Sequence, residues 1–243
     1  MPLEQSQAIV LRNFNIGDQD KIVIFLTDQH GIIKGVAKGA RKFGNRFGSS
    51  LEPMSKIKVF YYEKEKKELV TISNCDLLES FFEITARPET SFNLSYFSEL
   101  IEEFFPSRSQ DELLFRLLFS ILRSLKEEGN VDFLSAYFEA WFLKINGVLP
   151  DLKKCLKCQR ELTSPGWLSP KKDGVFCSRC APHKKEKVDP AIKDFLRWIS
   201  KNPPPSQKNL PLPSPRIKNL RKIFQSILIF HMEKEPKSLQ YLK

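Results

Sequence analysis

The amino-acid sequence predicts an α+β protein of several domains, and three features of its pattern support that prediction. Up to about residue 84, short β-branched and aromatic runs alternate with turn signals, which is typical of short strands. From Pro88 onward the apolar spacing changes from a period of about 2 residues to about 3.6, which is typical of helices. Two C-x2-C pairs follow in the last part of the chain.

These changes, together with shifts of charge, divide the chain into four expected parts. We expect a β-barrel domain over residues 1–84, a helical domain over 85–150, a metal-binding subdomain over 151–187, and C-terminal helices over 188–243 that pack on the helical domain. Basic residues exceed acidic ones by 39 to 29, a net charge of +10, and residues 151–243 alone carry 21 basic and 8 acidic side chains. The sequence therefore predicts anionic partners.

The first part contains five runs that predict antiparallel strands. The runs cover residues 7–14, 21–27, 32–37, 56–62 and 69–73. Five short strands in about 80 residues fit a small closed barrel. With a basic, glycine-rich loop after the third strand, such a barrel resembles an OB-fold, whose faces and loops commonly bind single-stranded nucleic acid. An SH3-like or other small barrel stays open as an alternative.

The loop after the third expected strand is the clearest candidate for a nucleic-acid contact. Residues 34–46, KGVAKGARKFGNR, hold five basic residues and no acidic one, and glycines at 35, 39 and 44 allow the backbone to approach a surface closely. Basic side chains can bind phosphates, and neighbouring aromatic rings can stack on bases. The contact residues that we predict are Lys34, Lys38, Arg41, Lys42, Phe43, Arg46 and Phe47. A solvated hairpin loop is the alternative.

Three helices are expected in the helical domain, over residues 92–105, 110–126 and 131–146. Ser109 and Glu112 have the spacing of a capping box at the start of the second helix. On that helix Arg116 and Arg123 lie on one stripe beside Phe115, Phe119 and Leu122. Arg116, Phe119 and Arg123 could form a groove for an acidic peptide with a hydrophobic tip. The alternative is two arginines at the rim of an ordinary core.

The cysteine spacing predicts a structural zinc site. Cys155 and Cys158 form one C-x2-C pair, Cys177 and Cys180 form another, and 18 residues separate the pairs. Four thiolates complete a tetrahedron around one Zn²⁺ and leave no open position for water, so we expect a scaffold and no zinc chemistry. Two disulfides, or a site that uses His183 in place of Cys180, are the alternatives.

Neither an enzyme nor a membrane protein is expected. The three histidines lie far in sequence from any plausible nucleophile, and the chain contains neither a GxxxxGK[ST] nor a GxGxxG motif. The first residues lack the pattern of a signal peptide, and no window approaches the roughly 18 consecutive apolar residues of a membrane span. These observations favour a cytoplasmic binding protein without a membrane partner.

The order of barrel, aromatic-rich helices, C-x2-C pairs and terminal helix resembles the bacterial RecO family of recombination mediators. The most specific part of the resemblance covers residues 8–53. There Thr27 and Gly31 match a T-x-x-x-G turn, and residues 37–42 match an AKGARR-like loop. Residues 231–242 are similar to the closing segment of the family, so the resemblance extends over nearly the whole chain.

The resemblance implies functions that composition and spacing do not show. It implies an OB-fold that binds single- and double-stranded DNA and promotes annealing of complementary strands. It also implies a partnership with RecR that helps to load RecA on DNA covered by single-strand binding protein. The acidic tail of that protein would dock on the helical domain, and the protein would be associated with the nucleoid. An RNA-binding zinc-ribbon protein and a non-catalytic adaptor are the alternatives.

Overall fold

The computed structural model describes residues 2–63, 68–106, 108–109, 111–127, 129–204 and 212–242. The chain forms two compact units, Met1–Leu122 with Pro236–Lys243, and Arg123–Glu235. The four parts predicted from the sequence follow changes of secondary structure and do not coincide with these units, whose boundaries fall within residues 85–150 and 188–243. The division into four domains stays a prediction. Within the described ranges, every helix is too short or too polar to cross a bilayer.

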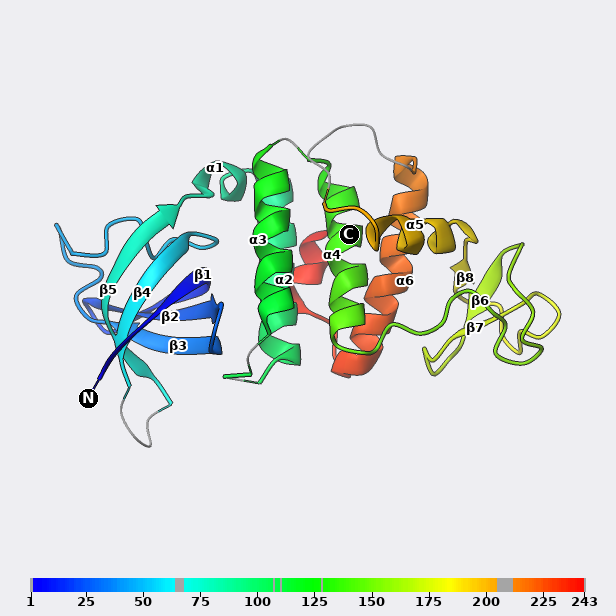
Figure 1. Cartoon of the computed structure of the whole chain (residues 1–243), viewed down its shortest axis with the longest axis horizontal. Coiled ribbons are helices and arrows are strands. Elements are labelled where there is room, and N and C mark those ends of the chain that lie inside the picture. Colours follow the sequence, from blue (N-terminus) through cyan, green and yellow to red (C-terminus); the bar gives the residue numbers. More distant parts are fainter. Residues whose placement is uncertain are drawn as a thin grey trace. The chain divides into compact units, whose positions relative to one another are not determined.

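Five strands of the first unit close into a barrel (Figure 1). They are β1 (Leu3–Ile16), β2 (Asp20–Thr27), β3 (Gly31–Ala37), β4 (Lys56–Tyr62) and β5 (Val70–Glu79), in the order β1-β2-β3-β5-β4. Only the β3–β5 pairing is parallel, and it comprises Gly35 with Val70 and Val36 with Thr71. The predicted five-stranded, OB-like barrel is confirmed.

Side chains of each strand point alternately into and out of the barrel, and those that point inward form an apolar core. Val23 and Phe25 of β2, Val59 of β4 and Ile72 of β5 point inward and are at most 1% exposed. The opposite faces of β1, β2 and β3 also carry buried apolar residues, among them Leu11, Ile24 and Ile32, and α2 (Pro88–Phe104) packs against β1. Ser98 of α2 donates a hydrogen bond to the Leu11 carbonyl at 3.3 Å. The barrel therefore has one covered side.

Shorter helices complete the first unit. α1 (Phe82–Thr85) precedes α2, and α3 (Glu112–Lys126) begins after it. The C-terminal 3-10 helix η1 (Lys237–Leu242) returns to α2, where Glu99 accepts hydrogen bonds from the Lys237 and Ser238 amides at 2.8 and 2.9 Å. Burial opposes ionisation of Glu99, but these bonds and the Ser238 hydroxyl outweigh it and lower the pKa of Glu99. The end of the chain is thus fastened to the first unit.

The predicted capping box of α3 is wrong. The helix begins at Glu112, and the Asp111 carboxylate accepts a hydrogen bond from the Leu114 amide at 2.9 Å. Aspartate is as good an N-cap as serine, and here it lies three residues before the amide that it caps. Ser109 instead lies in the preceding segment.

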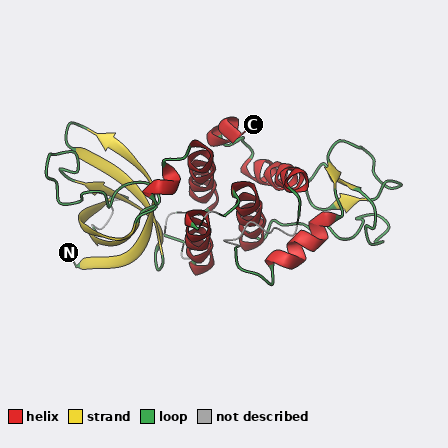
Figure 2. Cartoon of the chain, turned by 90° about the horizontal axis from the view of Figure 1, so that it is seen from above, coloured by secondary structure: helices red, strands yellow, loops and turns green. Residues whose placement is uncertain are grey.

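The second unit consists of helices and a small sheet (Figure 2). α4 (Val131–Ile145), α5 (Ala191–Ile199) and α6 (Ser214–Met232) supply its aromatic core, in which the Phe133 and Phe195 rings meet edge to face at 5.5 Å. The sheet has the order β7-β6-β8, with β6 at Gly166–Leu168, β7 at Val175–Phe176 and β8 at Lys187–Val188. The cysteine pairs lie in the segments before β6 and after β7.

A buried ion network joins α4 to α6. Glu139 is fully buried, and its carboxylate accepts hydrogen bonds from Arg221 Nη2 at 3.2 Å and Gln225 Nε2 at 3.0 Å. Arg221 Nη1 also lies 3.0 Å from Asp132. A carboxylate without solvent needs such donors, because an unpaired buried charge is strongly unfavourable. The network therefore fixes the pairing of the two helices.

We predict that Arg221→Ala lowers the free energy of unfolding by about 3–5 kcal/mol, because it leaves the Glu139 carboxylate buried without its counter-charge. Chemical denaturation measures the change. The control is Lys222→Ala, an exposed neighbour on the same helix, which should change stability by less than about 0.5 kcal/mol. Equal stability of the two variants would contradict the role of the network.

Candidate nucleic-acid interface and metal centre

The basic loop between β3 and β4 is held to the turn between β1 and β2. The Gly39 amide donates to Asp20 Oδ1 at 2.8 Å, and the Arg41 amide donates to the Gln19 carbonyl at 2.9 Å. The Arg41 guanidinium also donates to the Gly17 carbonyl at 2.9 Å. Arg41 thus holds the loop against the β1–β2 turn, in addition to contributing a positive charge.

Arg46 fastens the other end of the loop to β5. Its Nε donates to the Ser73 carbonyl at 2.7 Å, and its guanidinium lies 4.5 Å from the centre of the Phe47 ring. Phe47 is only 3% exposed and belongs to the barrel core. The prediction that Phe47 offers a face for base stacking is therefore wrong, because its ring is part of the barrel core and is not accessible.

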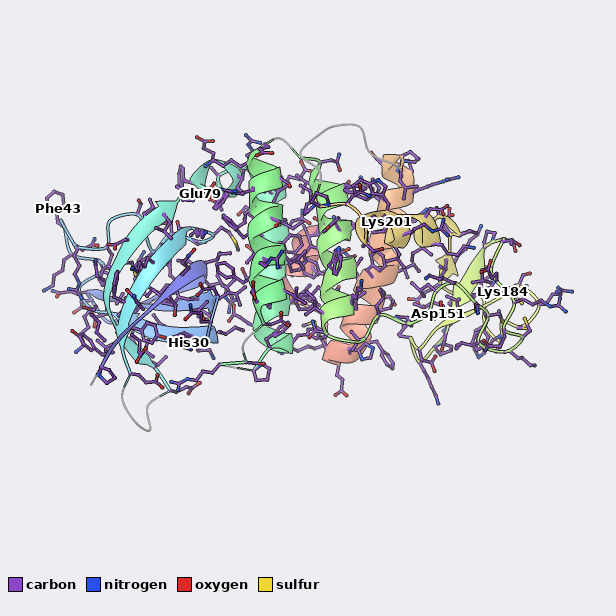
Figure 3. All side chains as sticks on the ribbon, viewed as in Figure 1. His30, Phe43, Glu79, Asp151, Lys184 and Lys201 are labelled. Atoms are coloured by element: carbon purple, nitrogen blue, oxygen red, sulfur yellow. The ribbon has the colours of Figure 1, made fainter. Side chains whose placement is uncertain are left out.

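The middle of the loop presents side chains to solvent. Lys38 and Lys42 are exposed, and neither has an ion pair or hydrogen bond through its ammonium group within the described part of the chain. Phe43 is fully exposed and points away from the barrel (Figure 3). Lys34 lies on β3 instead, 3.9 Å from Glu68. Of the predicted set, Lys38, Lys42 and Phe43 are the best placed to meet a ligand.

One group of surface residues was not singled out from the sequence. The run KIKVFYY of β4 alternates, so that Ile57, Val59 and Tyr61 are buried and the residues between them face outward. Those outward residues are Lys56, Lys58, Phe60 and Tyr62. The alternation of basic or aromatic residues with apolar ones is visible in the sequence. It could have marked this face once a strand was assigned.

The residues of the predicted peptide groove on α3 are less open than the helix pattern suggests. Phe115 and Leu122 are buried, at 7% and 0% exposure. The Phe119 ring packs edge to face on Phe81 at 6.3 Å, and Lys56 Nζ lies 4.1 Å from its centre. Arg116 is exposed and lies 3.9 Å from Glu112, and Arg123 is also exposed. Both arginines are therefore accessible at the surface, whereas Phe115 and Leu122 are enclosed.

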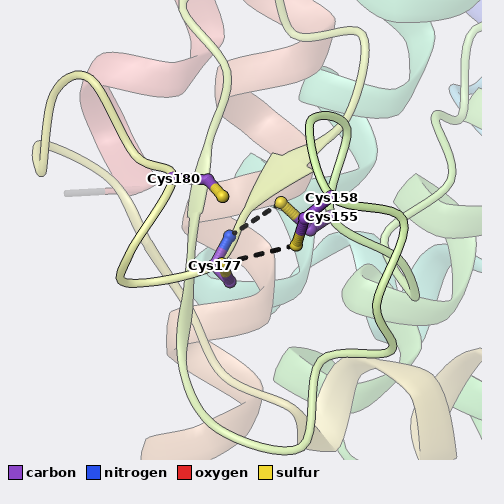
Figure 4. A group of neighbouring side chains, drawn as sticks. All are labelled: Cys155, Cys158, Cys177 and Cys180. Carbon is purple, nitrogen blue, oxygen red and sulfur yellow. Dashed lines mark hydrogen bonds between the residues drawn. The ribbon is translucent and has the colours of Figure 1, made fainter.

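The four cysteines of the two C-x2-C pairs come together at one point (Figure 4). Their sulfur atoms all lie within 4.8 Å of one another, and Cys158 Sγ is 3.9 Å from Cys177 Sγ. A tetrahedral site with metal–sulfur bonds of about 2.3 Å needs sulfur atoms about 3.8 Å apart. The observed 3.9 Å between Cys158 Sγ and Cys177 Sγ is far longer than a disulfide bond of about 2 Å. The group can therefore hold a metal ion.

The protonation of the thiols agrees with a cation site. Burial opposes ionisation of Cys155, but amide hydrogen bonds from Cys158, Cys177 and Lys157 outweigh it and lower the pKa of Cys155 to about 6. The neighbouring sulfur of Cys177, together with burial and the other thiols, raises the pKa of Cys180 to about 12. Four adjacent thiolates thus repel one another unless a cation lies between them. His183, the alternative ligand, is exposed and outside this group.

Cys75 is separate from the metal centre. It is 5% exposed and belongs to the barrel core. Burial raises the pKa of its thiol to about 12, so the side chain stays protonated and behaves as a small apolar residue.

The chain thus combines an OB-like barrel, a fold that commonly binds oligonucleotides, with a cationic loop and a four-cysteine cluster that can hold a metal ion. Residues 1–81 match the family model described as Recombination protein O N terminal, and residues 87–240 match Recombination protein O C terminal. The chain belongs to the RecO family of DNA repair proteins.

Curated relatives agree along nearly the full length. The DNA repair protein RecO of Koribacter versatilis is 34% identical over 236 residues, which cover 96% of this chain and 95% of the relative. The DNA repair protein RecO of Desulfatibacillum aliphaticivorans is 31% identical over 253 residues, which cover 100% and 97%. The family resemblance predicted from the sequence is confirmed.

We predict that Cys155→Ser abolishes metal binding and destabilises the segment around β6 to β8 by several kcal/mol, because a site with three thiolates holds a metal much less tightly. Elemental analysis of the purified protein measures the metal, with one ion per chain expected for the unmodified protein. The matched control is Cys75→Ala, which removes a buried thiol from the barrel and should keep the ion. Loss of metal in both variants, or in neither, would contradict the assignment.

Proposed function

We propose that the protein binds single- and double-stranded DNA through the phosphate groups and promotes annealing of complementary strands. The observation that carries the proposal is the loop after β3, which is tied at Arg41 and Arg46 and leaves Lys38, Lys42 and Phe43 free. Ammonium groups without partners can neutralise phosphates at no cost in broken ion pairs. Holding two strands by their backbones leaves the bases available for pairing.

The metal subdomain supplies a second cationic surface. The exposed basic residues there are Lys153, Lys154, Lys157, Arg160, Lys171, Arg179, Lys184, Lys185 and Lys187. Their clustering supports binding to phosphates without base readout. We infer that the metal ion is one structural Zn²⁺ held by Cys155, Cys158, Cys177 and Cys180. Zinc would keep these residues in place and do no chemistry, because thiolates fill all four positions.

As a member of its family, the protein would act as a recombination mediator without catalysis. In this proposal it works with RecR to load RecA on single strands that single-strand binding protein covers, in the cytoplasm at the nucleoid. The acidic tail of the covering protein would dock on α3, where Arg116 and Arg123 meet the acidic side chains and Phe119 meets the aromatic tip. The two exposed arginines support this placement, although Phe119 would have to leave part of its contact with Phe81.

We predict that Lys38→Ala with Lys42→Ala weakens DNA binding for all sequences and flattens the salt dependence. Loss of two phosphate contacts should reduce the slope of log K against log salt by about 1.4–1.8. Fluorescence anisotropy at several salt concentrations measures the slope. The matched control is Lys201→Ala with Lys222→Ala, two exposed lysines of the second unit that should leave the slope unchanged.

An unchanged slope in the loop variant would show that the loop does not contact phosphates. The same titration with RNA of matched sequence separates the alternatives. Tighter binding to RNA would favour an RNA-binding zinc-ribbon protein, because the 2′-hydroxyl is the group that distinguishes the two ligands. Absence of salt-dependent binding to either would favour an adaptor.

For the peptide contact, we predict that Arg116→Ala and Arg123→Ala each weaken binding of an acidic tail peptide by about 0.5–1 kcal/mol, as expected for solvent-exposed ion pairs. Titration of labelled peptide measures the change, and Arg87→Ala, an exposed arginine before α2, is the control. If all three variants bind equally, the tail docks elsewhere. A cleft of about 640 Å³ in the second unit, lined by Trp141, Lys144 and Lys193 among others, would then be the next candidate.

A further inference from the structure

The barrel face that OB-folds commonly use for nucleic acid is closed in this protein. That face is formed by strands 2 and 3. Three of its outward residues are apolar and buried, with Ile24 5% exposed, Leu26 1% and Ile32 2%, whereas the Lys34 side chain on the same face is 37% exposed. The Ile32 carbonyl also accepts a hydrogen bond from the Arg108 amide, and Ile32 lines a cleft with Phe104 and Phe105. The apolar part of this face is therefore covered and offers no surface on which bases can stack.

The outer face of β4 has the composition that the closed face lacks. Lys58, Phe60 and Tyr62 point outward and are half-buried, while Val59 and Tyr61 between them fill the barrel. Lys58 Nζ lies 5.2 Å from the centre of the Phe60 ring. A cation beside an aromatic face is the pairing that single-strand binding surfaces use, one for phosphates and the other for bases.

The strands on both sides of β4 extend this face with polar residues. The register places Phe60 between Gln5 of β1 and Asn74 of β5, and Lys58 between Gln7 and Asp76. Asp76 is the acidic residue of this set, and its Oδ1 accepts a hydrogen bond from Asn74 Nδ2 at 3.0 Å. The surface is thus aromatic, amide-rich and cationic. These are properties that fit bases and phosphates better than an apolar protein partner.

This face is continuous with the basic loop. Arg46 binds the Ser73 carbonyl of β5, and Ser73 precedes Asn74, the cross-strand neighbour of Phe60. Adjacent strands of a sheet lie about 4.8 Å apart. Arg46 is therefore fastened to the strand next to the one that carries Phe60. A single strand that leaves Lys38 and Lys42 can pass over β5 onto β4.

We propose that the outer face of β4 is a stacking platform for the bases of single-stranded DNA, with Phe60 as the main aromatic contact, Tyr62 as a second one, and Lys58 as a phosphate contact. The proposal deepens the proposed function and rests on it. Paired bases in a duplex do not expose their faces. The platform therefore favours single strands, whereas the lysines of the loop serve both forms of DNA.

The test compares Phe60→Ala with Phe82→Ala, which removes a ring that is 65% exposed on α1 and lies outside the proposed platform. Anisotropy is measured with single-stranded DNA, with a duplex, and with an abasic strand of equal length. One stacked base accounts for roughly a 5- to 150-fold change in affinity. Phe60→Ala should show a loss in that range for the single strand and less than about a twofold change for the duplex and the abasic strand.

The outcomes separate this inference from the proposed function. If Phe60→Ala binds the single strand as tightly as Phe82→Ala, while the Lys38 and Lys42 variant is weakened, the loop binds DNA and the platform is wrong. If the unmodified protein binds no DNA, both proposals fall. An equal loss on the single and abasic strands also overturns the platform, because stacking requires a base.

A second variant tests the platform without deleting the aromatic side chain, so that a loss of folding cannot be mistaken for a loss of stacking. Phe60→Trp keeps a stacking ring and should retain the preference for single strands. Its indole adds a fluorophore to the first unit, since the three native tryptophans, Trp141, Trp167 and Trp198, all lie in the second. The added emission should be quenched by single-stranded DNA and unchanged by the abasic strand. Equal quenching by both would overturn the proposal.

Discussion

The barrel depends on one close approach, between β3 and β5 at Gly35. A Cβ atom at this position would lie 2.7 Å from Ile72 Cγ1 and 2.9 Å from Val70 Cγ2, too near for any side chain. The sequence suggested that Gly35 lets the backbone approach a ligand, whereas its close neighbour is β5. Because the parallel pairing comprises two residue pairs only, the barrel needs further contacts beyond it, and the following loop supplies them.

This requirement divides the basic residues of the loop into two groups. Arg41 and Arg46 donate to backbone carbonyls of the β1–β2 turn and of β5, as a planar guanidinium with several donors can. Lys38 and Lys42 have compact ammonium groups and remain in solvent. The arginines therefore hold the shape of the loop and the lysines keep their charge available. The two aromatic residues differ in the same way, since Phe47 is buried in the barrel core and Phe43 is exposed.

Buried charge in the second unit follows a related rule. The Glu139 carboxylate lies in the core only because Arg221 and Gln225 donate to it. The thiols of Cys155, Cys158, Cys177 and Cys180 lie close together, where the hydrogen bond with Cys177 and burial raise the pKa of Cys180 and keep it protonated unless a cation compensates. In both places the arrangement needs a counter-charge, which Arg221 of α6 supplies to Glu139 and which a bound cation can supply to the cysteines.

The sequence by itself determined the barrel, the helices, the cysteine cluster and the family, because each depends on short-range periods or on fixed spacings. The alternation in residues 56–62 and the two C-x2-C pairs lead directly to β4 and to a common centre for four sulfur atoms. Only the tertiary structure decided which residues of a pattern stay free. Burial of Phe47, the contacts of Phe119, and the contacts of β1 with Ser98 and of β3 with Arg108 arise from segments far apart in the chain. No local pattern records which neighbour will cover a side chain.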